Sequence, residues 1–255
     1  MKLTFLGTGT SQGIPVIGCD CEVCKSIDDR DKRLRCAALI TKDDSTILID
    51  SGPDIRQQLL RTGISALKKV LITHEHYDHT GGLDDLRPLG FKHHQGMDIY
   101  AQSYVHDIIK VKFDYAFTVQ KYPGAPKFNL FTINPFEEFI LDTIRVYPLA
   151  IQHGHLNILG FRFDDKLAYI TDANGIPEST LHSIYKIDTL VINALHHQAH
   201  HSHFTLAKAL SEIKKINPRQ AYIIHMSHQM GFHQTIEEEL PLNVRLAYDT
   251  LSIKV

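Results

Sequence analysis

The chain has 255 residues, 43% of them hydrophobic, which is enough for one large domain or two small ones. Its 27 basic and 29 acidic residues give a net charge of −2, which excludes a global field that would attract nucleic acid or an anionic membrane. No apolar run approaches the ~20 residues of a membrane span, and the first residues lack the apolar core of a signal peptide, so we expect a cytoplasmic protein.

Short apolar runs predict strands, and helix-like segments lie between them along the chain. The predicted strands are 3–6, 37–41, 46–50, 69–72, 98–101, 143–147, 158–163, 167–171, 189–193, 221–224 and 244–247. The predicted helices are 53–61, 83–89, 105–113 and 205–216. The last is the clearest, because Leu206, Leu210, Ile213 and Ile216 form one apolar stripe. The mixture, with no intervening linker, predicts one α/β domain over residues 1–255.

The segment 113–139 carries the turn signals Tyr122-Pro123-Gly124 and Asn134-Pro135. We expect it to be irregular and to overhang the functional site as a lid.

Three of the four cysteines, Cys19, Cys21 and Cys24, fall within six residues. This density is typical of a metal site in a reducing compartment rather than of a disulfide framework. Three thiolates can surround a tetrahedral zinc ion, and the fourth ligand must come from elsewhere in the chain. Cys36 and His228 are both candidates for that place.

Residues 74–79 read His-Glu-His-Tyr-Asp-His, which places four potential metal ligands directly after a predicted strand. In an extended segment alternate side chains share a side, so His74 and His76 can converge on one ion, and Asp78 and His79 point toward a second position. The zinc-protease motif His-Glu-x-x-His is excluded because position 78 is aspartate. Since two glycines follow at 81 and 82, we expect no helix through this cluster.

The pattern His-x-His-x-Asp-His resembles the signature of the metallo-β-lactamase superfamily. That resemblance implies an α/β fold of the αββα four-layer sandwich type, with a dinuclear metal site at the sheet edge. It assigns the first ion to His74, His76 and His153, the second to Asp78, His79 and His225, and a bridging role to Asp172. His155 competes with His153, and Asp50 is expected to orient a histidine of the first cluster.

The cysteine cluster, within an insertion at about 18–36, resembles the insertion of the PhnP-type cyclic phosphodiesterases. These enzymes also carry a histidine three residues past the last active-site histidine, which favours His228 as the fourth zinc ligand and leaves Cys36 as an inert core thiol. The resemblance implies a phosphodiesterase with two catalytic divalent ions (zinc, manganese or iron) and one structural zinc. The implied reaction is hydrolysis of a small cyclic phosphate, such as a phosphoribosyl 1,2-cyclic phosphate, by a hydroxide shared between the two ions.

A second histidine cluster spans residues 196–203, directly ahead of the predicted helix 205–216. The motif His203-x-Thr205 resembles one shared by phosphodiesterases of the superfamily, including tRNase Z. Backbone N–H groups at the start of a helix suit a phosphate, and a histidine beside them can protonate a leaving oxygen. His203 is therefore the candidate general acid. Asp78, as a ligand of the second ion, is the other candidate catalytic residue, and His196 and His203 are candidate substrate-binding residues.

Two other readings remain open. A tRNase Z-like nuclease would share the metal ligands and the His-x-Thr motif, but the near-neutral charge argues against nucleic acid as a partner. A cofactor-biosynthesis protein like PqqB would share the cysteine-rich insertion. We expect a small phosphorylated substrate and no membrane association, and a homodimer is left open.

Overall fold

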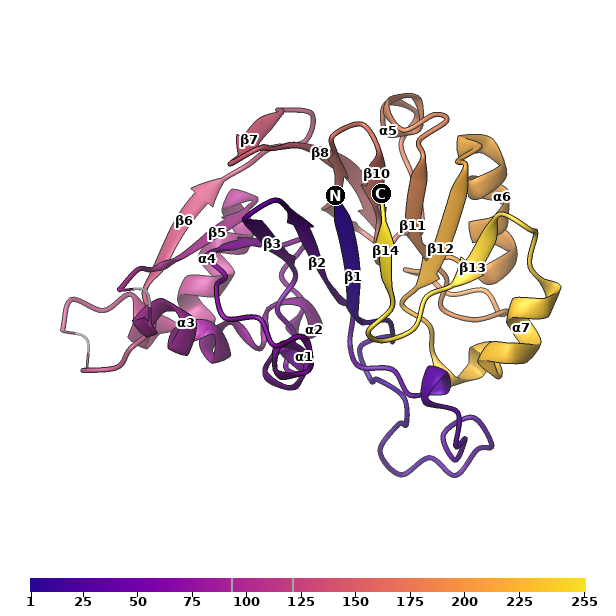
Figure 1. The fold of residues 1–255 in the computed structure, drawn as a ribbon, viewed down its shortest axis with the longest axis horizontal. Coiled ribbons are helices and arrows are strands. Elements are labelled where there is room, and N and C mark those ends of the chain that lie inside the picture. Colours follow the sequence, from indigo (N-terminus) through magenta and orange to yellow (C-terminus); the bar gives the residue numbers. More distant parts are fainter. Residues whose placement is uncertain (93, 121) are drawn as a thin grey trace.

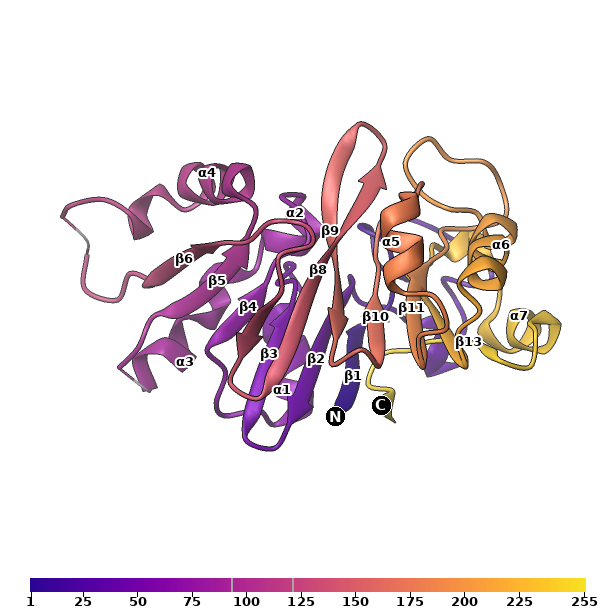
Figure 2. The same cartoon turned by 90° about the horizontal axis from the view of Figure 1, so that it is seen from above.

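Two mixed β-sheets pack face to face, and helices cover the outer face of each sheet (Figures 1 and 2). The computed structural model describes residues 1–92, 94–120 and 122–255. Met1 and Val255 lie side by side, since the Val255 amide donates to the Met1 carbonyl at 2.9 Å. None of the helices in the described ranges is long and apolar enough to cross a bilayer.

Each sheet has seven strands. The first contains, in spatial order, β14 (Ser252–Lys254), β1 (Lys2–Gly7), β2 (Ala37–Lys42), β3 (Ser45–Ile49), β4 (Lys69–Leu71), β5 (Met97–Ala101) and β6 (Phe128–Thr132). The second contains β13 (Val244–Leu246), β12 (Gln220–Ile224), β11 (Thr189–Asn193), β10 (Leu167–Tyr169), β9 (Leu156–Phe163), β8 (Ile144–His153) and β7 (Phe139–Leu141).

The helices divide between the two halves of the chain. The first half carries α1 (Ile55–Thr62), α2 (Tyr77–Thr80), α3 (Arg87–Lys92) and α4 (Ser103–Lys112), and the second carries α5 (Glu178–Ser183), α6 (Leu206–Ile216) and α7 (His233–Glu239). Short 3-10 turns are η1 (Asp29–Asp31), η2 (Leu83–Leu86), η3 (Asp114–Ala116) and η4 (His228–Met230).

Three apolar layers hold these elements together. Between the sheets, Phe5, Phe161 and Tyr169 are fully buried. A second layer packs the first sheet against α1 and α4, and a third packs the other sheet against α5, α6 and α7. Burying a large apolar side chain contributes roughly 1.5–3 kcal/mol, so these layers supply most of the driving force for folding. The order helix, sheet, sheet, helix confirms the predicted αββα sandwich.

Parallel strands bring candidate ligands from distant parts of the chain to one edge of the fold. Strands β3 to β6 run parallel to one another, as do β10 to β13. The carboxyl ends of parallel strands meet at one edge of a sheet, so segments that follow β4, β10 and β12 gather there. The turn of the β8–β9 hairpin, where His153 pairs with Leu156, reaches the same region.

Two expectations from the sequence need correction. Residues 113–139 are not irregular throughout, because they include η3 and the strand β6, which pairs with β5. The apolar residues of β6 complete the edge of the sheet and so favour a strand over a loop. Position 121 of this segment lies outside the described residues, and a lid role for the remainder stays a prediction. The predicted helix 83–89 is a 3-10 turn that continues into α3.

Candidate metal centres

The loop after β4 carries the first histidine cluster and is supported by the loop after β3. The Ser51 amide donates to the His79 carbonyl at 2.8 Å, and the Gly82 amide donates to the Ser51 carbonyl at 2.8 Å. A Cβ atom at Gly52 would lie 2.0 Å from the Asp78 carbonyl oxygen, so only glycine permits this approach. The expectation of no helix was wrong, because α2 forms one short turn that contains Asp78 and His79.

His74, His76 and His153 come together as one group. Their ring nitrogens lie within 4.8 Å of one another, and His74 Nε2 is 3.0 Å from His76 Nδ1. Two imidazoles on one tetrahedral zinc ion place their nitrogens about 3.3 Å apart, so this spacing suits a shared ion. His155, the alternative to His153, is exposed and lies outside the group.

Asp78, His79, Asp172 and His225 form a second group with ligand atoms within 4.8 Å of one another, all buried. Asp172 also groups with His153, so its carboxylate lies between the two sets of ligands. The sequence-predicted residues are thus brought together as two adjacent centres that share one carboxylate. Their roles as ligands stay a prediction.

Several of these side chains lie near the ends of strands, at residues whose backbone has a positive φ angle. Asp50 and His225 directly follow β3 and β12, and Asp172 lies three residues after β10; their φ angles are 62°, 58° and 59°. The left-handed region costs a non-glycine residue about 1–2 kcal/mol. At the end of a strand this conformation turns the side chain away from the alternating pattern and into the edge of the sheet.

Hydrogen bonds fix which ring nitrogen faces each centre. His79 Nδ1 donates to Asp50 Oδ2 at 2.7 Å, and His153 Nδ1 donates to the Ser202 carbonyl at 2.8 Å. The other nitrogen of each ring, Nε2, is therefore left with its lone pair free. Asp50 also accepts from the amide and hydroxyl of Thr73, so it is held in place as a carboxylate partner. This is the orienting role that was expected for Asp50.

The electrostatics of the second group fit a dication. His79 Nε2 lies 3.2 Å from oxygens of both Asp78 and Asp172, yet it has no hydrogen-bond partner among the described residues. Burial alone would lower the pKa of His79, but Asp78, Asp172 and Asp50 outweigh it and raise the pKa well above its usual value. The raised pKa reflects the negative charge concentrated around His79 Nε2, which a divalent cation neutralises more fully than a proton.

The first group fits a cation for a different reason. Burial, with the nearby ring of His79, lowers the pKa of His74 well below its usual value, so this imidazole is neutral. Burial also lowers the pKa of His76. Neutral imidazoles whose lone pairs converge are the form that binds a metal.

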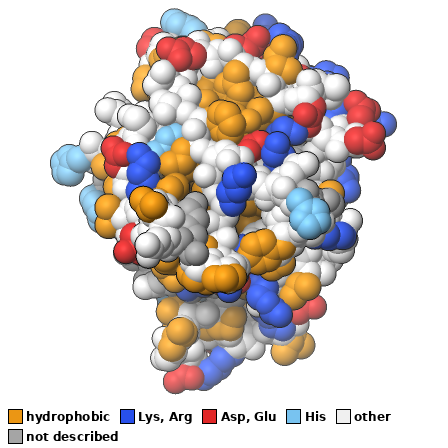
Figure 3. All heavy atoms as spheres, turned by 90° about the vertical axis from the view of Figure 1, so that its left-hand side faces the viewer, with side chains coloured by type: hydrophobic (Ala, Val, Ile, Leu, Met, Phe, Trp, Pro, Cys, Tyr) orange, Lys and Arg blue, Asp and Glu red, His pale blue; other side chains and the backbone are white. Residues whose placement is uncertain are grey.

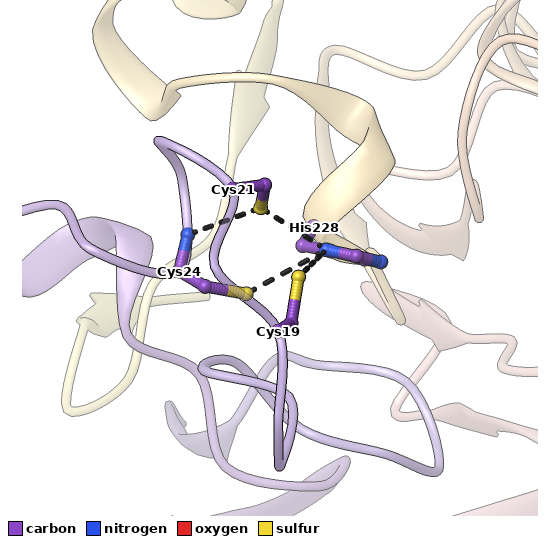
Figure 4. A group of neighbouring side chains, drawn as sticks. All are labelled: Cys19, Cys21, Cys24 and His228. Atoms are coloured by element: carbon purple, nitrogen blue, oxygen red, sulfur yellow. Dashed lines mark hydrogen bonds between the residues drawn. The ribbon is translucent and has the colours of Figure 1, made fainter.

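The cysteine cluster lies apart from these two groups. Figure 4 shows three thiols from one loop pointing at His228, which comes from η4. The Sγ atoms of Cys19, Cys21 and Cys24 lie 3.3, 3.2 and 3.5 Å from His228 Nδ1. A tetrahedral zinc ion with thiolate and imidazole ligands separates sulfur from nitrogen by about 3.6 Å.

The thiols of this cluster differ in acidity, because burial raises the pKa of Cys24 to about 11. The Cys24 amide and His228 lower the pKa of Cys21 to about 6, toward the thiolate form that zinc requires. Cys36 is 1% exposed in the core between the two sheets. Of the two candidates for the fourth ligand, His228 is therefore the one that the fold places at the cluster.

The second histidine cluster forms a loop beside the metal centres, residues 196–203, which we call the His loop. His203 Nδ1 lies 3.8 Å from Asp172 Oδ1, and the His203 ring is 4.9 Å from the rings of both His153 and His225. His196 is buried and accepts from the Gln198 amide, and it belongs to neither group of ligands.

The helix start behind the His loop differs from the expectation. The Leu206 amide donates to the His196 carbonyl, and the Lys208 amide donates to Thr205 Oγ1. Two amides that were expected to be free for a phosphate are therefore already bonded. A phosphate in this region depends on side chains more than on the end of α6.

Several contacts in the site could not be inferred from the sequence. The hydroxyl of Thr10, in the glycine-rich turn after β1, lies 3.2 Å from His225 Nε2. The Ser202 carbonyl that orients His153 is a backbone atom, so no residue type signals it.

Comparison with known proteins identifies the family. Residues 45–226 match the family described as Beta-lactamase superfamily domain. The chain belongs to the metallo-β-lactamase superfamily. A diphosphatase of the PhnP family has the same fold with a TM-score of 0.92 and 35% identity, over 100% of this chain and 97% of that one. The expected resemblance to PhnP-type enzymes is thus confirmed, and a metal-dependent hydrolase agrees with these matches.

Two further relatives frame the range of functions. An octanoyltransferase from Porphyromonas gingivalis is 40% identical to this chain, and the match covers 98% of this chain and 51% of the octanoyltransferase. The chain therefore spans about half the length of this curated relative. Zinc-bound PqqB from Methylobacterium extorquens matches with a TM-score of 0.81 over all of both chains, but at 17% identity it shows the shared fold alone.

Proposed function

We propose that the protein is a dinuclear metal-dependent hydrolase that cleaves a small phosphodiester, a cyclic phosphate or a diphosphate linkage. The observation that carries the proposal is the pair of ligand groups joined at Asp172. It is supported by the 35% identity to a PhnP-family diphosphatase across the whole chain. Two divalent ions bound here would supply Lewis-acid activation of water and of the phosphate oxygens.

The residues present divide the work as follows. His74, His76 and His153 would hold one ion; Asp78, His79 and His225 would hold the other, with Asp172 between them. Zinc, iron and manganese all suit this set of imidazoles and carboxylates. Asp50 keeps the Nδ1 proton of His79 in place, so that Nε2 stays available. Cys19, Cys21, Cys24 and His228 would hold a third, structural zinc.

His203 is the proposed proton donor. Burial and the neighbouring ring of His225 lower the pKa of His203 to about 3, so the ring is neutral near pH 7 in this structure. A bound phosphate adds negative charge beside the ring and raises this pKa, which allows the ring to protonate a leaving oxygen. The ligand atoms of His203, Asp172 and His153 lie within 4.8 Å of one another, so His203 could itself bind an ion. A test of His203 as proton donor must therefore also measure the metal content of the variant. His196, within the same loop, remains a proposed substrate-binding residue.

A nuclease like tRNase Z is less well supported. Basic, acidic and hydrophobic side chains are mixed on the face beside β6 and α3 (Figure 3), in line with the net charge of −2. Recognition of a long polyanion relies on a concentration of positive charge.

The test is a substrate panel on purified, metal-reconstituted protein. It contains bis-p-nitrophenyl phosphate, a ribose 1,2-cyclic phosphate, a 2′,3′-cyclic nucleotide, a diester of diphosphate and an octanoyl thioester. The proposal predicts metal-dependent cleavage of at least one phosphorus ester or anhydride. The thioester covers the second candidate, acyl chemistry, because a relative with 40% identity is an octanoyltransferase, although this chain matches only 51% of that protein. Cleavage of the thioester alone would refute the phosphodiesterase proposal.

A further inference from the structure

Three loops meet beside the two ligand groups, and the side chain of Asn174, on one of them, bonds to the other two. These loops are the β8–β9 turn with His153, the segment after β10 with Asp172, and the His loop with His203. Asn174, two residues after Asp172, is the side chain at their junction. Its own amide donates to the Gln152 carbonyl at 2.9 Å, which fixes its backbone against the end of β8.

The carboxamide of Asn174 uses both of its ends. Its Oδ1 accepts from the Gly154 amide at 3.1 Å, and its Nδ2 donates to the His201 carbonyl at 2.8 Å. The first bond lies next to His153, and the second lies two residues before His203. One planar group therefore sets the distance between the β8–β9 turn and the tip of the His loop.

The tip of the His loop has few other attachments. The Ser202 carbonyl accepts from His153 Nδ1, and His197 Nε2 donates to the Met230 carbonyl at 2.9 Å. Residues 198–203 form no helix or strand, so isolated bonds such as these, together with the 2.8 Å bond from the Phe204 amide to the Ala173 carbonyl, hold the tip in place. Loss of the Asn174 bond would loosen the segment that carries His203, between the anchors at His197 and Phe204, while leaving the ligand groups themselves intact.

We propose that Asn174 is a positioning residue that holds the His loop against the metal centre, so that His203 faces the leaving group of the substrate. The effect on the loop is independent of the reaction, and the effect on proton donation rests on the proposed function. Asn174 acts through His203 and is not expected to touch the substrate.

Two substitutions separate the bonds of Asn174. Asn174→Asp keeps an oxygen for the Gly154 amide but places a second oxygen against the His201 carbonyl, whereas Asn174→Ala removes both bonds. Asn243→Asp is a matched control, because Asn243 is also half-buried and its Nδ2 donates to the Pro218 carbonyl at 3.3 Å. The control lies between α7 and β13, away from the ligand groups.

The first readout needs no activity. Hydrogen–deuterium exchange of peptides covering 196–205 should be about 2- to 12-fold faster in Asn174→Asp, the factor that one lost side-chain hydrogen bond supports. Bound metal, measured on the same samples, should be unchanged, and Asn243→Asp should exchange as the unmodified protein does. Unchanged exchange of this segment in Asn174→Asp would overturn the proposal, whatever the kinetics show.

The second readout is the dependence on the leaving group. Asn174→Asp should lower kcat by about tenfold for an alkoxide leaving group, which is part of the ~10²–10⁴-fold that a general acid supplies, with little change for p-nitrophenolate. In the background of His203→Ala this difference should vanish. Equal losses on both substrates would refute the link to His203. If the unmodified protein cleaves no phosphorus ester, the proposed function fails, and exchange alone decides the role of Asn174 in the loop.

Discussion

Asp50 offers a sharp test of how the second centre is built, because it is fully buried and hydrogen-bonds to the candidate ligand His79. In Asp50→Asn, the carboxamide cannot accept on both sides. Whichever way it is turned, its N–H group faces either the Nδ1 proton of His79 or the Thr73 amide. We therefore expect His79 to lose both its orientation and the negative charge that supports its basicity.

The expected magnitude follows from this geometry. Loss of a partner that orients a metal-binding histidine costs about 10- to 100-fold in metal affinity, or roughly 1.4–2.8 kcal/mol. Burial and the local charges keep the effect toward the upper end of that range, because no solvent reaches the 2.7 Å contact.

The assay is a competition titration of zinc against a fluorescent chelator. Asp142→Asn is the matched control, since Asp142 also accepts from two side chains, Ser45 and Lys69, but lies in the turn between β7 and β8. The control should change the affinity less than about twofold. An affinity within twofold of the unmodified protein for a folded Asp50→Asn would refute the proposed role of Asp50.

Four further predictions concern stability and turnover. Gly52→Ala should lower the free energy of unfolding by several kcal/mol, because the new Cβ atom would lie 2.0 Å from a carbonyl oxygen. Gly63→Ala, where the added Cβ meets open space but φ is 66°, should cost about 1–2 kcal/mol. Equal costs for the two variants in urea denaturation would contradict the close approach at Gly52. Cys21→Ser should release one zinc ion per chain and lower Tm more than it lowers turnover, and a stable but inactive variant would make the cysteine site catalytic. His203→Ala should reduce turnover by about 10²–10⁴-fold with both catalytic ions retained, and loss of an ion on elemental analysis would make His203 a ligand. Burial raises the pKa of Asp249 to about 6, so between pH ~4 and ~6 the folded protein holds a proton that the unfolded chain has released. The stabilisation from this proton is present below pH ~4 and is lost as the pH rises through ~6, so the stability of the unmodified protein relative to Asp249→Ala should fall by up to ~3 kcal/mol across that window. A stability difference that does not change with pH would exclude this role of Asp249.

The sequence predicted most of the strands and the grouping of the candidate ligands, because both leave local signals. All eleven predicted strands are present, since apolar runs of four to eight residues are a strong local pattern; ten agree within two residues at each end, whereas β8 ends at His153, six residues past its predicted end at 147. The spacing of His74, His76, Asp78 and His79 was informative for the same reason. The edge strands β6, β7 and β14 were missed, because pairing with β5, β8 and β1 decides them. The turn α2 was missed because its packing against Gly52 decides it.

What the sequence could not supply is the arrangement that links the loops. The left-handed backbone at Asp172 and His225 depends on the end of each strand in the folded sheet. Likewise, the bonds from Asn174 join residues 20 and 27 positions away along the chain. Asparagine in a loop usually satisfies its own turn, so nothing in the residue type indicated a contact at such a distance.

Anomalous diffraction from crystals of the protein reconstituted with zinc tests the central claim most directly. Two peaks should flank the carboxylate of Asp172, one beside His74, His76 and His153 and the other beside Asp78, His79 and His225. A third peak should lie among Cys19, Cys21, Cys24 and His228. A single peak at the histidine groups, or thiols at the cysteine cluster with no peak between them, would contradict a dinuclear hydrolase with a separate structural zinc.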